Sequence, residues 1–277
     1  MGYRLAGRLL LLGIVTTVPL SLLVPSTSGY LEATIPLFWI ALAGLLSRHS
    51  FVEIFSTRPA SSAYLVLATG LGLSIAGSFI TFEVALDYVT KGAWERFIQR
   101  VPDSPLPSSL SVAIFIVAYL CVTEELLFRG FLVPSFDELG IGAAVFIPAM
   151  IFTLLHAPIN MPVALLMSVI GACLLLTTKS VWPAAAMHSV NNLIGLIINR
   201  TFPTKPMIPS VIVLLAGIGL LYSQRRNFKD LMNAIREAWR DLSISSLKAM
   251  LSEWSYVAIL VLSGMNVVAW FALVAKR

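Results

Sequence analysis

The stretch LSVAIFIVAYLCVTEELLFR, from Leu110 to Arg129, indicates the fold class. Its first segment, residues 110–121, is uncharged and almost wholly apolar, as expected of a helix in hydrocarbon. Its second segment adds two acids, Glu124 and Glu125, and a base. An ionisable side chain inside a membrane costs roughly 2.5–3.5 kcal/mol on insertion scales, so it normally faces the protein interior and has a function. The stretch therefore predicts a transmembrane helix whose polar end does chemistry.

The composition extends this interpretation to the whole chain. Of 277 residues, 58% are hydrophobic and 12% are charged, with a mean hydropathy of +0.88, whereas about 25% are charged in ordinary soluble domains. The ranges that approach the length of a span are Leu9–Val24, Tyr30–Leu46, Ala63–Tyr88, Ser109–Phe128, Ile141–His156, Val163–Thr178, Pro183–Ile198, Pro209–Tyr222 and Tyr256–Val274. We expect an all-α, polytopic transmembrane helix bundle of eight or nine spans with a membrane-embedded active-site cavity.

The chain divides into three regions. Residues 1–107 hold the N-terminal spans and an interfacial helix and linker after Lys91, residues 108–200 hold the polar clusters, and residues 201–277 hold the C-terminal spans. Between the last two spans, residues 224–253 repeat apolar side chains at spacings of three and four, with Arg and Lys between them. This pattern is typical of a basic helix on the inner membrane surface or of a helix packed on the ends of the bundle. Both remain open.

The positive-inside rule predicts the orientation. With the N-terminus inside, the inner segments hold most of the 19 Lys and Arg residues, namely Arg4, Arg8, Arg48, Arg58, Arg129, Lys179, Arg225, Arg226, Lys229, Arg236, Arg240 and Lys248. We expect a multi-pass protein of the cell membrane whose first span is not cleaved, since it lacks a clear small-x-small site. The formal charge of +5 fits anionic lipid headgroups and requires no nucleic acid.

Helical spacing assigns different tasks to the two acids. Glu125 precedes Arg129 by one turn, the favourable orientation for an ion pair. Glu124 is about 100° away around the axis, so both carboxylates cannot serve Arg129 equally. We expect Glu125 to be the structural partner and Glu124 to act on a proton as a general base. The alternative is that both acids only cap the inner end of a span.

Two of the three histidines lie in later apolar ranges, each with a partner one turn away. Phe152 precedes His156, and Asn192 follows His188. An imidazole and an amide on one face can stabilise an oxyanion, although a lone intramembrane histidine more often hydrogen-bonds between helices. Three clusters in one bundle favour a shared site. His156 reaches the depth of Glu124 only if its helix stops short or begins below the hydrocarbon core.

The two cysteines, Cys121 and Cys173, both lie within spans and form no C-x-x-C pair. We interpret them as small apolar residues rather than as a disulfide or a metal pair.

Taken in order, Glu124-Glu125-x-x-x-Arg129, Phe152-x-x-x-His156 and His188-x-x-x-Asn192 resemble the three motifs of the type II CAAX prenyl endopeptidase family, also called the CPBP or ABI intramembrane proteases. The resemblance covers roughly Leu110–Asn199. It implies a glutamic-type intramembrane endopeptidase without a cofactor, acting on a membrane-anchored protein or peptide in the bilayer.

The resemblance also implies a role for each motif residue. Glu124 and His156 would activate the attacking water. His188 and Asn192 would stabilise the tetrahedral oxyanion. The residues that would support the site are Glu125, Arg129 and Phe152.

Two alternatives to this interpretation remain. Glu124, His156 and His188 supply one carboxylate and two imidazoles, which can ligate zinc, but the metal-free mechanism leaves every motif residue a separate task. A transporter or a bacteriocin-immunity-type binding protein would use the polar cluster without proteolysis. It requires polar residues along a path to both membrane faces, and Glu83 and Asp87 are the main ones available. The intramembrane protease motifs H-E-x-x-H, G-x-G-D and G-x-S-G do not occur.

Overall fold

The computed structural model is all-helical, as predicted, and describes residues 2–23, 28–46, 50–98, 109–202 and 207–275. In chain order the helices are α1 (Tyr3–Leu23), α2 (Ser28–Leu46), α3 (Phe51–Phe55), α4 (Ser62–Val89), α5 (Ala93–Ile98), α6 (Leu110–Glu125), the π-helix η2 (Leu126–Leu132), α7 (Val133–Ser135), the 3₁₀-helix η3 (Asp137–Leu139), α8 (Ile141–Leu154), α9 (Met161–Thr178), α10 (Trp182–Thr201), α11 (Met207–Ser223), α12 (Arg225–Asp241), α13 (Ile244–Leu251) and α14 (Trp254–Ala275). Each predicted span range overlaps a helix, but Ser109 precedes α6, Leu155 and His156 lie beyond the end of α8, and Val24 lies outside the described residues.

Among the described residues, four helical segments are long and apolar enough to cross a membrane. They are Ser62–Val89, Leu110–Ser135, Met161–Thr178 and Trp254–Ala272. The pair α11 and α12, bent by 91°, makes up to a fifth, and Thr34–Leu45 and Ile141–Leu154 are shorter apolar helices. The fold is therefore a helical bundle with several candidate spans, consistent with a multi-pass membrane protein. The count of eight or nine spans and the orientation stay predictions.

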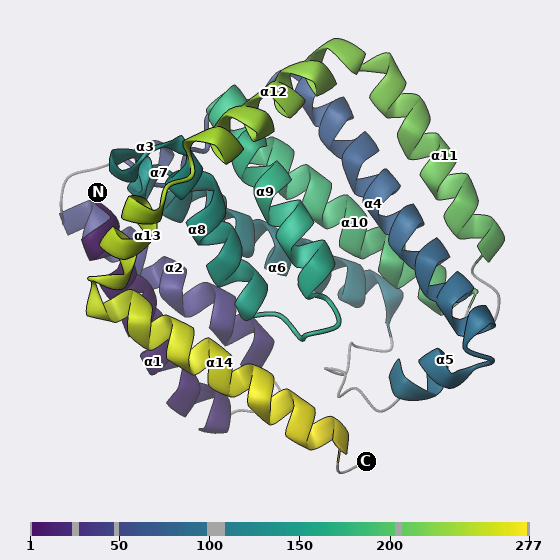
Figure 1. Ribbon diagram of the computed structural model, residues 1–277, viewed down its shortest axis with the longest axis horizontal. Coiled ribbons are helices and arrows are strands. Elements are labelled where there is room, and N and C mark those ends of the chain that lie inside the picture. The colour runs from purple at the N-terminus through teal and green to yellow at the C-terminus, as the bar shows by residue number, and fades with distance from the viewer. Residues whose placement is uncertain (1, 24–27, 47–49, 99–108, 203–206, 276–277) are drawn as a thin grey trace.

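The central helices are α6, α8, α9 and α10 (Figure 1). α8 packs on α9, while α10 contacts α4, α6 and α9. α1, α2 and α14 lie on one side of this centre, and α4 and α11 lie on the other (Figure 1). α4 and α11 approach closely through glycines, because a Cβ on Gly77 would lie 2.6 Å from the backbone nitrogen of Leu214. All three sequence motifs thus belong to central elements.

The amphipathic segment after α11 packs on the end of the bundle. α12 crosses α8, α9 and α4 (Figure 1) and buries Leu231 and Ala238. The ring of Trp239 meets that of Phe146 at 5.4 Å between centroids, and the Asp241 carboxylate accepts a hydrogen bond from the Gly142 backbone at 2.9 Å. In the structure α12 is thus packed on the end of the bundle, and its position on the inner membrane surface stays a prediction. The exposed basic residues of α12 are Arg225, Arg226, Lys229, Arg236 and Arg240.

The predicted interfacial helix after Lys91 corresponds to α5. Asp87, at the end of α4, accepts a hydrogen bond from the backbone of Glu95 in α5 at 2.8 Å, so this carboxylate joins two helices. The linker that follows, with the predicted boundary between residues 107 and 108, lies outside the described residues.

Candidate active site

The two adjacent acids lie where α6 becomes the π-helix η2. Hydrogen bonds of the i to i+5 type widen the helix at this point, and such segments occur frequently at functional sites. Gly130 of η2 lies against α3, where a Cβ would overlap the carbonyl oxygen of Phe55. The close approach of these two backbones therefore requires glycine at this position.

Glu125 and Arg129 form the predicted ion pair. Glu125 Oε1 lies 2.9 Å from Arg129 Nη1, and each side chain is only 1% exposed. The guanidinium carbon lies 4.4 Å from the centre of the Phe152 ring, and a Cβ on Gly171 of α9 would lie 3.1 Å from Arg129 Nε. The contact of Nη1 with Glu125 Oε1 is an ion pair without hydrogen-bond geometry, and no other described residue accepts a hydrogen bond from Nη1. The guanidinium is thus held by a close charge contact and ring stacking in a narrow slot.

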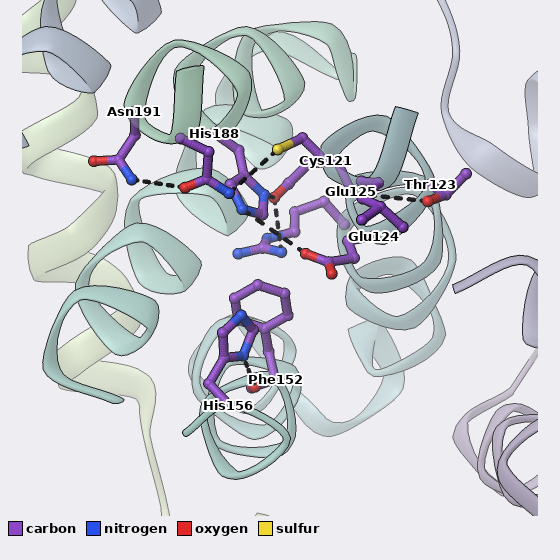
Figure 2. Close-up of polar contacts among 11 residues, drawn as sticks. Cys121, Thr123, Glu124, Glu125, Phe152, His156, His188 and Asn191 are labelled. Carbon is purple, nitrogen blue, oxygen red and sulfur yellow. Dashed lines mark hydrogen bonds and ion pairs between the residues drawn. The ribbon is translucent and has the colours of Figure 1, made fainter. Parts of the chain in front are cut away.

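The same carboxylate also holds His188 of α10, a contact that the sequence did not predict. His188 Nδ1 lies 2.8 Å from Glu125 Oε1, and His188 Nε2 lies 3.8 Å from Glu124 Oε2 (Figure 2). A carboxylate only accepts, so Nδ1 carries the hydrogen. The second distance is too long for a hydrogen bond. Glu125 therefore connects Arg129 to His188, while Nε2 faces Glu124.

His156 lies in the turn beyond α8, because that helix ends at Leu154. The helix thus ends two residues before His156, and the depth of His156 in the membrane stays a prediction. His156 Nδ1 lies 2.8 Å from the carbonyl oxygen of Phe152 (Figure 2), which lies in the last turn of the helix and also accepts from the backbone of Leu155 at 3.3 Å. Nδ1 therefore donates, and in the neutral ring Nε2 can accept a proton. The ring of Phe152 lies 4.4 Å from that of His156 and 5.9 Å from that of His188.

Glu124 and Asn192 are the most open members of the site. The Glu124 side chain is 30% exposed, and its carboxylate accepts no hydrogen bond from any residue that the structure describes. The Asn192 side chain donates from Nδ2 to the sulfur of Cys121 at 3.4 Å and accepts at Oδ1 from Asn191 at 2.9 Å. The contact between Cys121 and Asn192 was not predicted from the sequence. The sequence does contain a signal for this contact. Cys121 precedes Glu125 by one helical turn and Asn192 follows His188 by one turn, so two antiparallel helices that pair Glu125 with His188 also bring Cys121 next to Asn192.

The structure thus brings all seven motif residues together from α6, η2, the end of α8 and α10. Six are linked by the contacts above, and Asn192 joins them through Cys121 of α6. Over the described residues of the chain, no group of three or more His, Cys, Asp or Glu side chains is arranged to hold a metal ion. Cys121 and Cys173 are buried and free.

An apolar hollow of about 250 Å³ lies between α2, α3 and Leu126. None of the four predicted catalytic residues lines it. The predicted membrane-embedded cavity around the site stays a prediction.

Comparison with known proteins agrees with the motif analysis. The family model described as type II CAAX prenyl endopeptidase Rce1-like matches residues 106–194. This range contains all seven motif residues, and the resemblance drawn from the three motifs is thereby confirmed. No curated protein and no solved structure matches the chain.

Proposed function

We propose that the protein is an intramembrane endopeptidase of the glutamic type, which hydrolyses a peptide bond of a membrane-anchored protein or peptide. The observation that carries the proposal is the contrast between adjacent carboxylates. Glu125 is 1% exposed and paired with Arg129, whereas Glu124 is 30% exposed and free of hydrogen bonds from the described residues. An open carboxylate beside two imidazoles suits a general base.

The base acts on water. In this mechanism Glu124 removes a proton from a water molecule that also hydrogen-bonds to His156 Nε2. The oxygen of that water attacks the carbonyl carbon of the substrate and forms a tetrahedral intermediate. Glu124 then gives its proton to the departing amine as the carbon–nitrogen bond breaks, and the site returns to its starting state.

His188 and Asn192 provide the donors for the oxyanion. Asn192 donates through Nδ2. His188 donates through Nε2 when both ring nitrogens are protonated, and the carboxylates that face the two nitrogens suit that charged state. Donors aimed at the developing charge stabilise the transition state more than the substrate.

We prefer this mechanism to the zinc alternative. A zinc site of Glu124, His156 and His188 would use the general base as a ligand, leaving no carboxylate free for the proton. We expect treatment with phenanthroline to leave peptidase activity intact and elemental analysis to find well below stoichiometric zinc. Stoichiometric zinc that is lost together with activity, and restores activity when added back, would make Glu124 a ligand.

The proposed topology places the site near the inner face of the cell membrane, in a bundle of eight or nine spans with the N-terminus inside. The core of the enzyme is the region of residues 108–200, between the N-terminal region (residues 1–107) and the C-terminal region (residues 201–277). Reporter fusions after each predicted span test the topology, and an N-terminus on the outer side would contradict it.

The function is tested by cleavage. The purified full-length protein in liposomes is incubated with internally quenched membrane peptides, with and without a C-terminal prenylated cysteine motif, since the matching family is described as prenyl endopeptidases. We expect the wild type to cleave at least one peptide and Glu124→Gln to cleave it at least about 10²-fold more slowly. Equal rates for the two proteins would show that the activity does not come from this site.

A further inference from the structure

α6 and α10 face each other through two side-chain pairs at matching helical positions. On α6, Cys121 precedes Glu125 by one turn, and on α10, Asn192 follows His188 by one turn. Glu125 pairs with His188 at 2.8 Å, and Cys121 pairs with Asn192 at 3.4 Å. The pairing order shows that the two helices run antiparallel here. The Cys121–Asn192 pair therefore lies one helical turn from the Glu125–His188 pair along the same interface.

The contacts of Asn192 determine the orientation of its amide. One Nδ2 hydrogen points to Cys121 Sγ, and Oδ1 accepts from Asn191 Nδ2 at 2.9 Å. No further hydrogen bond reaches this side chain from the residues described. The second Nδ2 hydrogen consequently has no partner among the described residues, and Asn192 is exposed. A flipped amide would present its oxygen instead, which an oxyanion repels.

Cys121 itself is well placed to orient rather than to react. It is 1% exposed, and its thiol also lies close enough to the His188 imidazole to interact with it electrostatically. In the structure the sulfur accepts from Asn192 Nδ2. Sulfur is a weak acceptor, so the contact contributes little binding energy, but it fixes where the amide nitrogen lies. Cys121 contacts Asn192, one of the two residues that donate to the oxyanion in the proposed function. Cys121 does not itself need to contact the substrate.

We propose that Cys121 is a positioning residue, whose sulfur holds the Asn192 amide so that its free N–H points at the oxyanion. The inference rests on the proposed function, in which Asn192 donates to the oxyanion. It predicts that removing the sulfur lowers turnover through Asn192 and leaves substrate binding unchanged.

The first test compares three variants of the full-length protein on the best-cleaved peptide of the panel above. We expect Cys121→Ala to lower kcat roughly two- to fivefold, in the lower part of the range for one hydrogen bond because sulfur is a weak acceptor, with KM unchanged. Cys121→Ser retains an acceptor and should keep most of the activity. Cys173→Ala is the matched control, because Cys173 is also buried, lies on α9 and has no side-chain hydrogen bond among the described residues. An equal loss of kcat in Cys173→Ala would mean a general packing effect and would overturn the proposal.

The second test is a double-mutant cycle. If Cys121 acts through Asn192, the variant Cys121→Ala with Asn192→Ala should be no slower than Asn192→Ala alone. If the fold-losses in kcat of Cys121→Ala and Asn192→Ala multiply in the double variant, the two residues act independently. That result would contradict the proposal that Cys121 positions Asn192. Should no peptide be cleaved, or should Glu124→Gln match the wild type, the proposed function has failed rather than this inference.

A spectroscopic readout decides the inference without any turnover. With asparagine side chains labelled with ¹⁵N, the Asn192 amide resonance is assigned by its loss in Asn192→Ala. We expect that resonance to shift in Cys121→Ala and to stay in place in Cys173→Ala. An unchanged resonance in Cys121→Ala would overturn the positioning role whatever the protein cleaves.

Discussion

The site has two halves made of similar side chains in different surroundings. The buried half consists of Glu125, Arg129 and Phe152, and the open half of Glu124, His156 and Asn192. Each half has a carboxylate, and the two carboxylates are neighbours in the chain. Glu125 is committed to Arg129 and His188, whereas Glu124 is partly exposed and accepts no hydrogen bond from a described residue. The difference shows that surroundings, and not residue type, assign the task.

The physical reason is desolvation. A buried charge is stable only when it is paired, and removal of one partner leaves the other charge without compensation. In the proposed mechanism the buried half therefore supports His188, which Glu125 contacts at 2.8 Å. The open half can keep groups unsatisfied, because water or a substrate can meet them. The following predictions test this contrast, from the largest expected effect to the smallest.

The largest effect is expected in the open half. Glu124→Gln keeps the size and polarity of the side chain but removes the base, so we expect kcat to fall by about 10²–10⁴. The melting temperature should stay near that of the wild type, because this carboxylate makes no hydrogen bond to a described residue. Kinetics and thermal unfolding of the same preparation measure both. A stable variant with wild-type kcat would assign the base elsewhere.

The matching change in the buried half should act on stability. Glu125→Gln removes the charge opposite Arg129, although the amide oxygen can still accept from His188. Breaking a buried ion pair costs about 3–5 kcal/mol. We expect a lower free energy of unfolding, measured by denaturant titration, together with lost activity. If Glu125→Gln is as stable as the wild type and inactive, the two glutamates have exchanged roles.

Asn192 allows a finer test of the open half. Asn192→Ala removes one oxyanion donor and should lower kcat by about 10²–10³. KM should change little, because the donor acts mainly in the transition state. Steady-state kinetics separate the two constants. A variant that binds peptide weakly but turns it over normally would identify Asn192 as a substrate contact.

The smallest effect concerns the backbone that supports the buried half. Gly130→Ala places a methyl group against the Phe55 carbonyl, and we expect a loss of about 1–3 kcal/mol in the free energy of unfolding. Gly195→Ala on α10 is the control, since nothing lies within 4 Å of the added Cβ. That change should be neutral or stabilise the helix by up to about 1 kcal/mol. Equal unfolding curves for the two variants would show that η2 moves freely away from α3.

Much of this site was predictable because the residues of each motif lie within about one helical turn of each other in the sequence. The spacing of Glu125 and Arg129 predicted an ion pair that the structure contains at 2.9 Å. The three motifs predicted a family resemblance that the match over residues 106–194 confirms. Cys121, in contrast, was interpreted only as a small apolar residue, because nothing in its own helix marks it as polar. Its function depends on what α10 places opposite it.

The sequence by itself determined the helices, the apolar character of the bundle and the identity of the polar residues, because helical period and the cost of charge in hydrocarbon act along one chain segment. Only the tertiary structure decided that Glu125 holds His188, that Cys121 faces Asn192, that α8 ends before His156 and that α12 packs across the bundle. These features depend on the register between helices, and register is set by packing of many side chains at once. The pairing of α6 with α10 is therefore a property of the fold rather than of either motif.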